Sequence, residues 1–376
     1  DPSKYRSVVE LLEESFRTFR DRRAFICMDR ALTYGELDEL SQALAAHLQS
    51  TGLKDGARVA IMMPNVLQYP VTVAAVLRAG CIAVNVNPLY TARELGHQLE
   101  DSGAEAVIVL DNFATTLQQA LAGRSAVKHV IVGSMGDLLG FPKGLVVDFV
   151  LRHVRKIVPA YSLPGHVKFK DALAQGSALP FTRPALGPDD VAVLQYTGGT
   201  TGVAKGATLL HRTIVANLLA SEAWMQPGLR RKKLEGQFNI VCALPLYHVF
   251  AFVTCGLLGM RTGALNILIP DPRDMTPEEF RGVRDLIERK VQVIATPGST
   301  PGSVVAKSAT SSIPIVFASG GDPVALGLVP SLSRPAGNVT GVNFLLATLG
   351  SKRLDLLRQL VPKASIIGML VNPGSG

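Results

Sequence analysis

The 376-residue sequence predicts an α/β protein, and two observations lead to that fold class. Short apolar runs typical of buried strands alternate along the chain with longer segments that have helical periodicity. Apolar residues make up 47% of the chain, which is enough to form a large core. The alternation implies a parallel sheet with helices packed on its faces.

The first clear helix signal is the capping box Thr33-Tyr34-Gly35-Glu36, which predicts a helix running to Leu48. The run RVAIMM at residues 58–63 is then typical of a buried strand. The next elements along the chain are a helix at residues 66–79 and strands at residues 81–86, 106–110, 130–132 and 191–195.

Two apolar segments resemble membrane elements. Residues 240–260 carry no formal charge and are long enough to span a bilayer. Pro245 and the pair Tyr247-His248 interrupt that segment, so a buried strand, a loop and a core helix are the better interpretation. Residues 144–158 predict a mostly apolar helix with a basic end. The sequence favours a packed helix there and leaves a role at a membrane surface open.

Charge and cysteine content narrow the classes of partner. The net charge of +8 favours phosphates, nucleotides or an anionic membrane surface. No nucleic-acid-binding motif accompanies it, so we do not expect nucleic acid as a partner. The cysteines have neither metal nor redox spacing and predict reduced thiols in a cytoplasmic protein. The chain begins without Met or a signal-peptide pattern, so we expect a processed or truncated start.

The stretch YTGGTTGVAKGA at residues 196–207 predicts a phosphate-binding loop. Its glycines let backbone N–H groups converge on an anion. The threonine hydroxyls can donate hydrogen bonds or help hold Mg²⁺, and Lys205 supplies a positive charge. The spacing differs from the Walker A loop because Val-Ala separates Gly202 from Lys205. We expect a strand before the loop and a helix from Gly206 onward, including residues 211–220.

This loop resembles that of the AMP-forming adenylating enzymes, in the form typical of bacterial long-chain fatty-acyl-CoA synthetases. Further segments resemble the same family in the expected order, and together they cover residues 1 to about 275. They are LTYGELDELS (32–41), VAIMMPN (59–65), VNPLYTARELGHQLEDSGA (86–104), FPKGLVVDFVLRHV (141–154) and ALPLYHVFA (243–251).

The resemblance implies the N-terminal domain of the adenylate-forming fold and a two-step ligation. ATP and a fatty acid would form an acyl-adenylate, and coenzyme A would then displace AMP, with Mg²⁺ as the metal. Lys205 and His248 would be catalytic, and Thr200 would contact Mg²⁺. The ATP phosphates would contact Tyr196, Thr197, Gly198, Gly199, Thr200, Thr201, Gly202, Lys205 and Gly206.

The resemblance also implies features that the chain does not contain. The family has a Tyr-Gly-x-Thr-Glu motif, a Thr-Gly-Asp motif, an Arg and a C-terminal Lys after the phosphate loop. We therefore expect the domain at residues 1–275 to be incomplete and this chain to be inactive in the full reaction.

The composition changes at about residue 276, because residues 276–376 contain no Cys, Tyr, His or Trp. Strands are expected at 291–295, 313–318 and 366–371, and helices at 300–309 and 352–360. The segment resembles an internal part of an ABC-transporter substrate-binding protein, which implies a partial periplasmic-binding-protein-like α/β domain. Solute binding is therefore the alternative function, with Thr300, Asp322 and Thr340 as candidate ligand residues. We expect a chimeric or truncated reading frame, or else a natural fusion.

Overall fold

The computed structural model describes residues 2–122, 126–197, 204–231, 237–242, 244–270, 294–297, 300–319, 322–335 and 337–343. The chain divides into two compact units, Asp1–Ala295 and Thr296–Gly376. The sequence places a family boundary near residue 276 instead, and that boundary stays a prediction.

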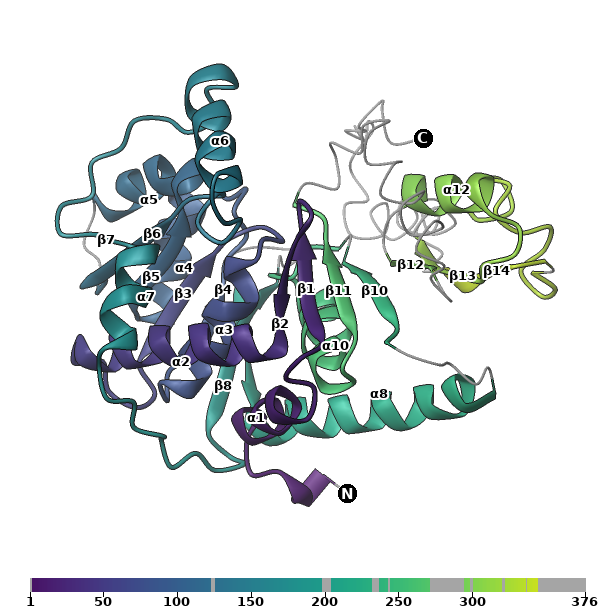
Figure 1. Cartoon of the computed structure of the whole chain (residues 1–376), viewed down its shortest axis with the longest axis horizontal. Coiled ribbons are helices and arrows are strands. Elements are labelled where there is room, and N and C mark those ends of the chain that lie inside the picture. Colours follow the sequence, from purple (N-terminus) through teal and green to yellow (C-terminus); the bar gives the residue numbers. More distant parts are fainter. Residues whose placement is uncertain are drawn as a thin grey trace, which may run out of the picture. The chain divides into compact units, whose positions relative to one another are not determined.

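The larger unit contains a seven-stranded sheet in the order β7-β6-β5-β3-β4-β8-β9 (Figure 1). Its neighbouring strands are parallel except for β8 and β9, which are antiparallel. The strands are β3 (Arg58–Met62), β4 (Ile82–Asn85), β5 (Ala104–Leu110), β6 (His129–Gly133), β7 (Val167–Lys168), β8 (Val191–Thr197) and β9 (Lys205–Leu210).

Both faces of this sheet are buried, which explains the apolar runs in the sequence. In β3, Val59 and Ile61 belong to one core cluster, and Ala60 and Met62 belong to the other. The helices that follow the strands are α3 (Gln68–Arg78), α4 (Ala92–Ser102), α5 (Ala114–Leu121) and α7 (Phe169–Ser177).

A second sheet joins the start of the chain to residues more than two hundred positions later. Its order is β10-β11-β1-β2, and only the β1–β2 hairpin is antiparallel. The helix α3 is buried along its whole length. The strands are β1 (Arg23–Cys27), β2 (Arg30–Thr33), β10 (Asn239–Cys242) and β11 (Leu265–Leu268).

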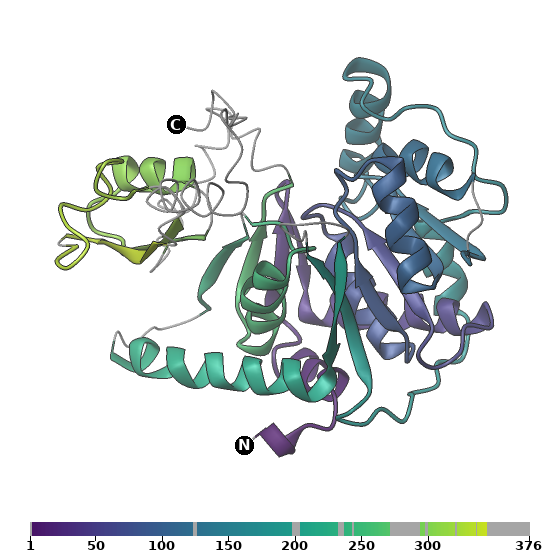
Figure 2. The ribbon, with the colours of Figure 1, turned by 180° about the vertical axis from the view of Figure 1, so that it is seen from behind.

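Helices complete the larger unit. From behind, α8 is the long teal helix beside the green elements of the second sheet (Figure 2). It contacts both the N-terminal helix α1 and α10. The remaining elements are η1 (Pro2–Lys4), α1 (Val8–Thr18), α2 (Tyr34–Ser50), η2 (Asp111–Phe113), α6 (Lys143–Phe149), η3 (Val150–Val154), α8 (His211–Arg231), α9 (Val249–Ala251), η4 (Phe252–Leu257) and α10 (Leu258–Arg261).

Most of the elements expected from the sequence are present. The capping box is confirmed: Thr33 Oγ1 accepts from the Glu36 amide, and the Glu36 carboxylate accepts from the Thr33 amide. Residues 240–260 begin in β10, and residues 249–261 form α9, η4 and α10. Among the described residues, no helix is long and apolar enough to cross a membrane.

The helix predicted from Gly206 onward is wrong at its start. Residues 205–210 form strand β9, and α8 begins only at His211. The chain reverses after β8 and pairs antiparallel with it, so the ladder satisfies those backbone groups of β9 that face β8. The glycine-rich loop therefore connects two strands of a hairpin.

A three-stranded sheet in the order β12-β13-β14 belongs mostly to the smaller unit, because the boundary after Ala295 falls within β12. The elements of this part of the chain are β12 (Ile294–Pro297), α12 (Thr300–Ala309), β13 (Ile315–Ser319) and β14 (Val339–Asn343). The helix predicted at 300–309 is confirmed, whereas β14 was not anticipated. The elements expected at 352–360 and 366–371 lie outside the described residues.

Candidate active site

The predicted phosphate loop begins and ends on the β8–β9 hairpin. Register pairs Thr197 with Lys205 and Tyr196 with Gly206, so the two ends of the loop lie next to each other. Lys205 is exposed, and its ammonium group forms no ion pair with any residue in the described part of the chain. An unpaired cation at the mouth of a glycine-rich loop suits a phosphate.

Five of the predicted phosphate-binding residues lie outside the described residues, so their roles stay predictions. They are Gly198, Gly199, Thr200 (also the predicted Mg²⁺ ligand), Thr201 and Gly202. No group of three or more His, Cys, Asp or Glu side chains in the described ranges is arranged to hold a metal.

Tyr196 anchors the base of the hairpin. Its side chain is buried, and its hydroxyl donates a hydrogen bond to the carboxylate of Asp101 at the end of α4. Burial raises the pKa of Tyr196 well above its ordinary range, and the hydrogen bond to Asp101 raises it further. The hydroxyl is thus neutral and already engaged, and in this structure Tyr196 holds β8 onto α4.

A chain of buried amides lies at the carboxyl ends of β4 and β8. The Asn85 Nδ2 donates to Gln195 Oε1 at 3.1 Å, and the Gln195 Nε2 donates to the Tyr247 carbonyl oxygen at 3.0 Å. The Tyr69 hydroxyl lies 2.7 Å from Asn85 Oδ1 and 2.8 Å from the Leu246 carbonyl oxygen. This network fixes the segment Leu244–His248 against the strand that carries the loop.

Asn65, three residues after β3, holds the same segment from the other side. Its Nδ2 donates to the carbonyl oxygens of Cys242 and Leu244 at 2.8 and 2.9 Å. Its Oδ1 accepts from the Leu246 amide at 2.7 Å. One buried side chain therefore bonds three backbone groups, of which the Cys242 carbonyl oxygen also accepts from the Ile269 amide at 3.3 Å.

His248 is exposed at the end of this turn. Its amide donates to the Pro245 carbonyl oxygen, and its Nδ1 accepts from the Phe250 amide at 3.4 Å, so it caps the short helix α9. The neighbouring Tyr247 carbonyl accepts from Gln195, two residues before Thr197. The structure thus brings the His248 segment to the end of the strand that leads into the loop.

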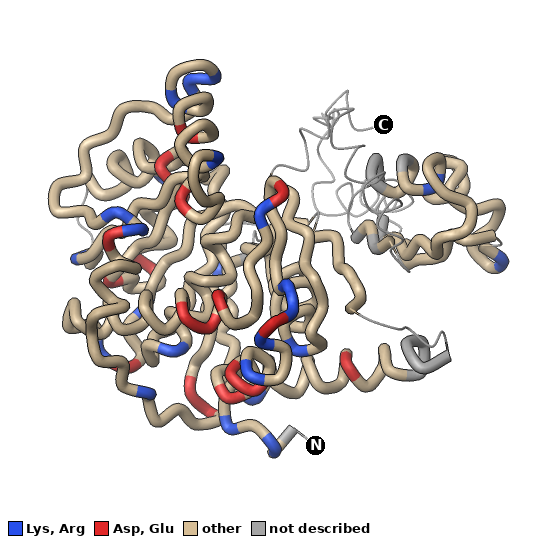
Figure 3. The backbone as a smooth tube through the Cα atoms, viewed as in Figure 1, with Lys and Arg blue, Asp and Glu red and all other residues tan. Residues whose placement is uncertain are grey.

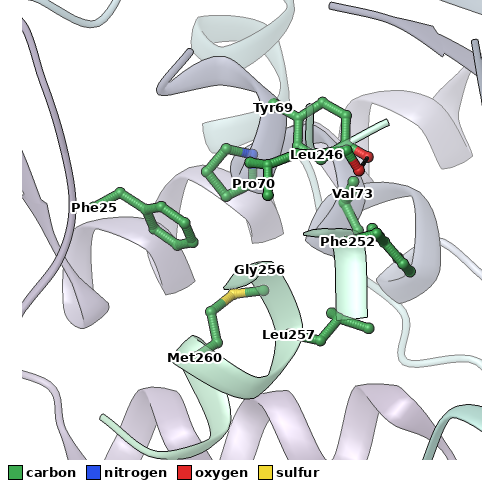
Figure 4. A pocket seen from close by; sticks show the side chains of 9 residues that line it. All are labelled: Phe25, Tyr69, Pro70, Val73, Leu246, Phe252, Gly256, Leu257 and Met260. Carbon is green, nitrogen blue, oxygen red and sulfur yellow. Dashed lines mark hydrogen bonds between the residues drawn. The ribbon is translucent and has the colours of Figure 1, made fainter. Parts of the chain in front are cut away.

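A small apolar cavity is lined in part by Leu246 and Phe252. These two residues flank His248 in the sequence. The cavity has a volume of about 10 Å³, which is about the space one water molecule needs. It has no room for a long acyl chain in this structure. Figure 4 shows the residues that line it, which are Phe25, Tyr69, Pro70, Val73, Leu246, Phe252, Gly256, Leu257 and Met260.

Comparison with known proteins identifies the family. The family model described as "AMP-binding enzyme" matches residues 12–340. The chain belongs to the AMP-binding enzyme family. The match passes residue 276 and includes β12, β13 and Thr340, which the sequence assigned to a solute-binding segment. None of these comparisons supports that segment or its partial periplasmic-binding-protein-like fold.

Relatives within the AMP-binding family include a long-chain-fatty-acid–CoA ligase of Escherichia coli. It is 49% identical over 276 residues, which cover 73% of this chain and 48% of the relative. The chain thus spans about half the length of the curated relatives it matches. The MbtA apo structure from Mycobacterium smegmatis has a TM-score of 0.66 at 25% identity and covers 85% of this chain and 54% of that one.

A long-chain-fatty-acid–CoA ligase from Archaeoglobus fulgidus has a TM-score of 0.62 at 23% identity, over 85% of this chain and 59% of that one. At that identity the likeness shows the fold alone. The α/β fold predicted for the larger unit is therefore that of the AMP-binding enzymes.

Sequence reasoning missed the amide network of Asn65, Asn85 and Gln195. The signal was present, because each is a polar residue at or just beyond the end of an otherwise apolar strand. Such residues at the carboxyl ends of parallel strands commonly face a ligand cleft or support it. In this AMP-binding enzyme they hold the turn that carries His248.

The candidate ligand residues of the smaller unit have ordinary local surroundings. Asp322 Oδ1 accepts from the amides of Val324 and Ala325, so it stabilises the turn after β13. Thr340 lies within β14, and Thr300 is the first residue of α12. Their roles in ligand binding stay predictions.

Proposed function

We propose that this chain is part of an enzyme that ligates a long-chain fatty acid to coenzyme A through an acyl-adenylate, with ATP and Mg²⁺ as the activating pair, and that it supplies the ATP-phosphate site. The observation that carries the proposal is the 49% identity to a ligase of that name over 276 residues. Lys205, which begins β9 and forms no ion pair with the residues that the structure describes, agrees with it.

In this proposal Lys205 contacts the ATP phosphates together with the backbone amides of the loop at 198–203. A fixed cation beside the departing pyrophosphate would stabilise the charge that develops there. Thr200 would contact Mg²⁺, which commonly binds through few protein groups and the substrate's own phosphates. ATP supplies the adenylate, and coenzyme A supplies the thiol that accepts the acyl group.

His248 would lie near the acyl-adenylate, at the end of the turn that Asn65 and Gln195 hold. Because that turn is fixed by buried hydrogen bonds, its position relative to β8 is set before any substrate binds. Pre-organisation of this kind supports a role in positioning the substrate.

The cysteines support a cytoplasmic location as part of the proposal. All of them, Cys27, Cys81, Cys242 and Cys255, are buried free thiols. Burial raises the pKa of Cys27 and of Cys81 to about 12, so these two remain protonated and unreactive. Reduced thiols of this kind are typical of a reducing compartment.

The test is calorimetric titration of the chain with Mg·ATP. We expect saturable binding that Lys205→Ala weakens by roughly tenfold or more, because a charge-assisted contact contributes about 1.5–3 kcal/mol. Lys205→Arg should retain most of the affinity for Mg·ATP.

A second titration tests the substrate class. A stable long-chain acyl-adenylate analogue should bind more tightly than its acetyl counterpart, since each buried methylene contributes about 0.8 kcal/mol.

Lys54→Ala is the matched control, because Lys54 is also exposed but precedes β3, at the amino ends of the strands. Its affinity for Mg·ATP should equal that of the wild type. Equal binding by the Lys205→Ala variant would contradict the assignment of the phosphate site. Equal affinity for the long-chain and acetyl analogues would contradict the substrate class.

A further inference from the structure

The helix formed by α6 and η3, together with the residues that flank it, carries exposed apolar side chains, which we call the outer ridge. The fold leaves these side chains between 48% and 88% exposed. In Figure 1 this helix projects beyond the layer of the seven-stranded sheet. The outer ridge consists of Phe141, Leu145, Val146, Phe149, Val154 and Ile157. The packed helix favoured by the sequence is thus packed on one side only.

The inner side of the helix is fixed against the body of the larger unit. A Cβ atom on Gly144 would stand 2.3 Å from the Gly136 carbonyl oxygen, so the two backbones are in direct contact. Asp148 accepts from the Gly136 amide at 2.8 Å and from Ser134 Oγ at 2.7 Å. These contacts determine which side of the helix faces outward.

An ion pair adds to this attachment. Arg152 binds the carboxylate of Asp111, whose side chain is buried after β5. The outer ridge is therefore not a frayed segment whose apolar residues are exposed by chance. Several apolar side chains presented together by a well-anchored helix indicate an interaction surface.

Charge identifies the kind of surface that the outer ridge fits. Asp148 is the only acidic residue between positions 141 and 158, and it is turned inward. Arg155 and Lys156 follow η3, and neither side chain forms an ion pair or hydrogen bond within the described ranges. Figure 3 shows blue segments at the projecting end of this helix.

A row of apolar groups beside unpaired cations suits a membrane that carries anionic lipids. The apolar side chains can enter the acyl region while the cations remain at the phosphate headgroups. A second copy of the chain is a less suitable partner for the outer ridge, because two outer ridges in contact would bring their positive charges together. The net charge of +8 also favours attraction to an anionic membrane over contact with a second copy of the chain.

We propose that the outer ridge docks the protein on an anionic lipid surface, with Phe141, Phe149 and their neighbours in the interface and Arg155 and Lys156 at the headgroups. The protein then lies on the membrane without crossing it. This inference goes beyond the ligase proposal and does not depend on it, because it needs neither ATP nor a fatty acid.

The experiment is flotation of the full chain with vesicles of phosphatidylcholine alone or mixed with phosphatidylglycerol. We expect binding to the mixed vesicles and little binding to the neutral ones. The variant Arg155→Gln/Lys156→Gln should bind the mixed vesicles about 25-fold more weakly, at about fivefold for each cation. Phe141→Ser/Phe149→Ser should reduce binding by at least tenfold, because two large apolar groups no longer enter the interface.

Trp224→Ser is the matched control, since Trp224 is an aromatic residue on α8 that is 85% exposed outside the outer ridge. It should float like the wild type. All variants should have the same circular dichroism and thermal midpoint, since the changed side chains lie at the surface. Binding that is equal for both vesicle types, or unchanged in both ridge variants, would overturn the proposal. So would a dimer in sedimentation that Phe141→Ser/Phe149→Ser dissociates, because a second copy would then cover the outer ridge.

Discussion

The ring of Tyr196 lies across Gly206 so closely that no side chain fits between them. A Cβ atom at position 206 would stand 2.9 Å from Cζ and 3.0 Å from Cε2 of the ring. The two residues are register partners in the β8–β9 hairpin, and the ring is held by Asp101. Gly206 is therefore required by close approach to the tyrosine, whatever its amide does for a phosphate.

Gly206→Ala should destabilise the larger unit. The added methyl group must displace the buried Tyr196 ring or separate β9 from β8, which costs about 1–3 kcal/mol. The free energy of unfolding from urea denaturation measures this loss. Affinity for Mg·ATP should fall as well, because the two ends of the loop would move apart.

Tyr196→Ser supplies the internal check on that reasoning. In its background the ring is absent, so Gly206→Ala should cost much less than it does in the wild type. Gly187→Ala is the matched control, because its Cβ would be 3.6 Å from the nearest atom, an ordinary contact. An equal cost of Gly206→Ala in both backgrounds would show that the clash is not the cause.

Local signals were enough to predict most of the larger unit. The capping box at Thr33 and the buried strand β3 follow from residues within a few positions of each other. The hairpin partner β9 was missed because its pairing is with β8, and its own exposed sequence KGATLL has no buried periodicity. The second sheet was not predicted either, since β1 and β11 are paired across most of the chain.

The candidate site was predictable only in part for a similar reason. The glycines, threonines and lysine of the loop are contiguous, so their composition alone indicated a phosphate site. The support by Asn65, Asn85 and Gln195 depends on three separate strands whose ends meet in space. No spacing rule along the sequence connects those residues, although each is a polar residue in an apolar context.

Asn65→Ala should be among the more destabilising single changes at the site. It removes the Asn65 bonds to two carbonyl oxygens and one amide of residues 242–246, and the Leu244 carbonyl oxygen and the Leu246 amide lose their Asn65 partner. We expect a loss of about 2–4 kcal/mol in the free energy of unfolding. Urea denaturation followed by circular dichroism measures it.

Asn87→Ala is the control for Asn65→Ala, since Asn87 makes a local hydrogen bond to the Leu89 amide at the surface. Its cost should stay within about 0.5 kcal/mol. Similar losses for the two variants would mean that the Asn65 bonds add nothing beyond an ordinary surface contact.

His211 should make the protein sensitive to acid. It is buried at the start of α8, where its Nδ1 accepts from the Val8 amide at 3.1 Å. Burial lowers its pKa from 6.5 to about 4, against an opposing effect of Asp190. The stability from neutral His211 is complete above pH 6.5 and is lost as pH falls toward 4.

His211→Asn should remove this dependence, because its amide oxygen can accept from Val8 but does not titrate in that range. Between pH 6.5 and 4 the wild type should lose stability relative to the variant by at most about 1.4 kcal/mol per pH unit. Denaturant titrations across this range measure the difference. Parallel stability curves for the two proteins would rule out His211 as the sensor.

Asp111 should act in the opposite direction over an overlapping range. Burial raises its pKa from 3.8 to about 6, although Arg152 opposes the shift. A raised pKa means that its stability contribution is complete below pH 3.8 and is lost as pH rises through about 6. On acidification Asp111 therefore contributes more stability while His211 contributes less, and the two effects offset each other in the wild type.

Asp111→Asn removes the gain, so the unfolding free energy of this variant should fall more steeply with acid than that of the wild type. The double variant Asp111→Asn/His211→Asn should again show a shallow dependence of the unfolding free energy on pH. If that dependence is equally steep in Asp111→Asn and in the wild type, the Asp111 carboxylate keeps its ordinary pKa in the folded protein.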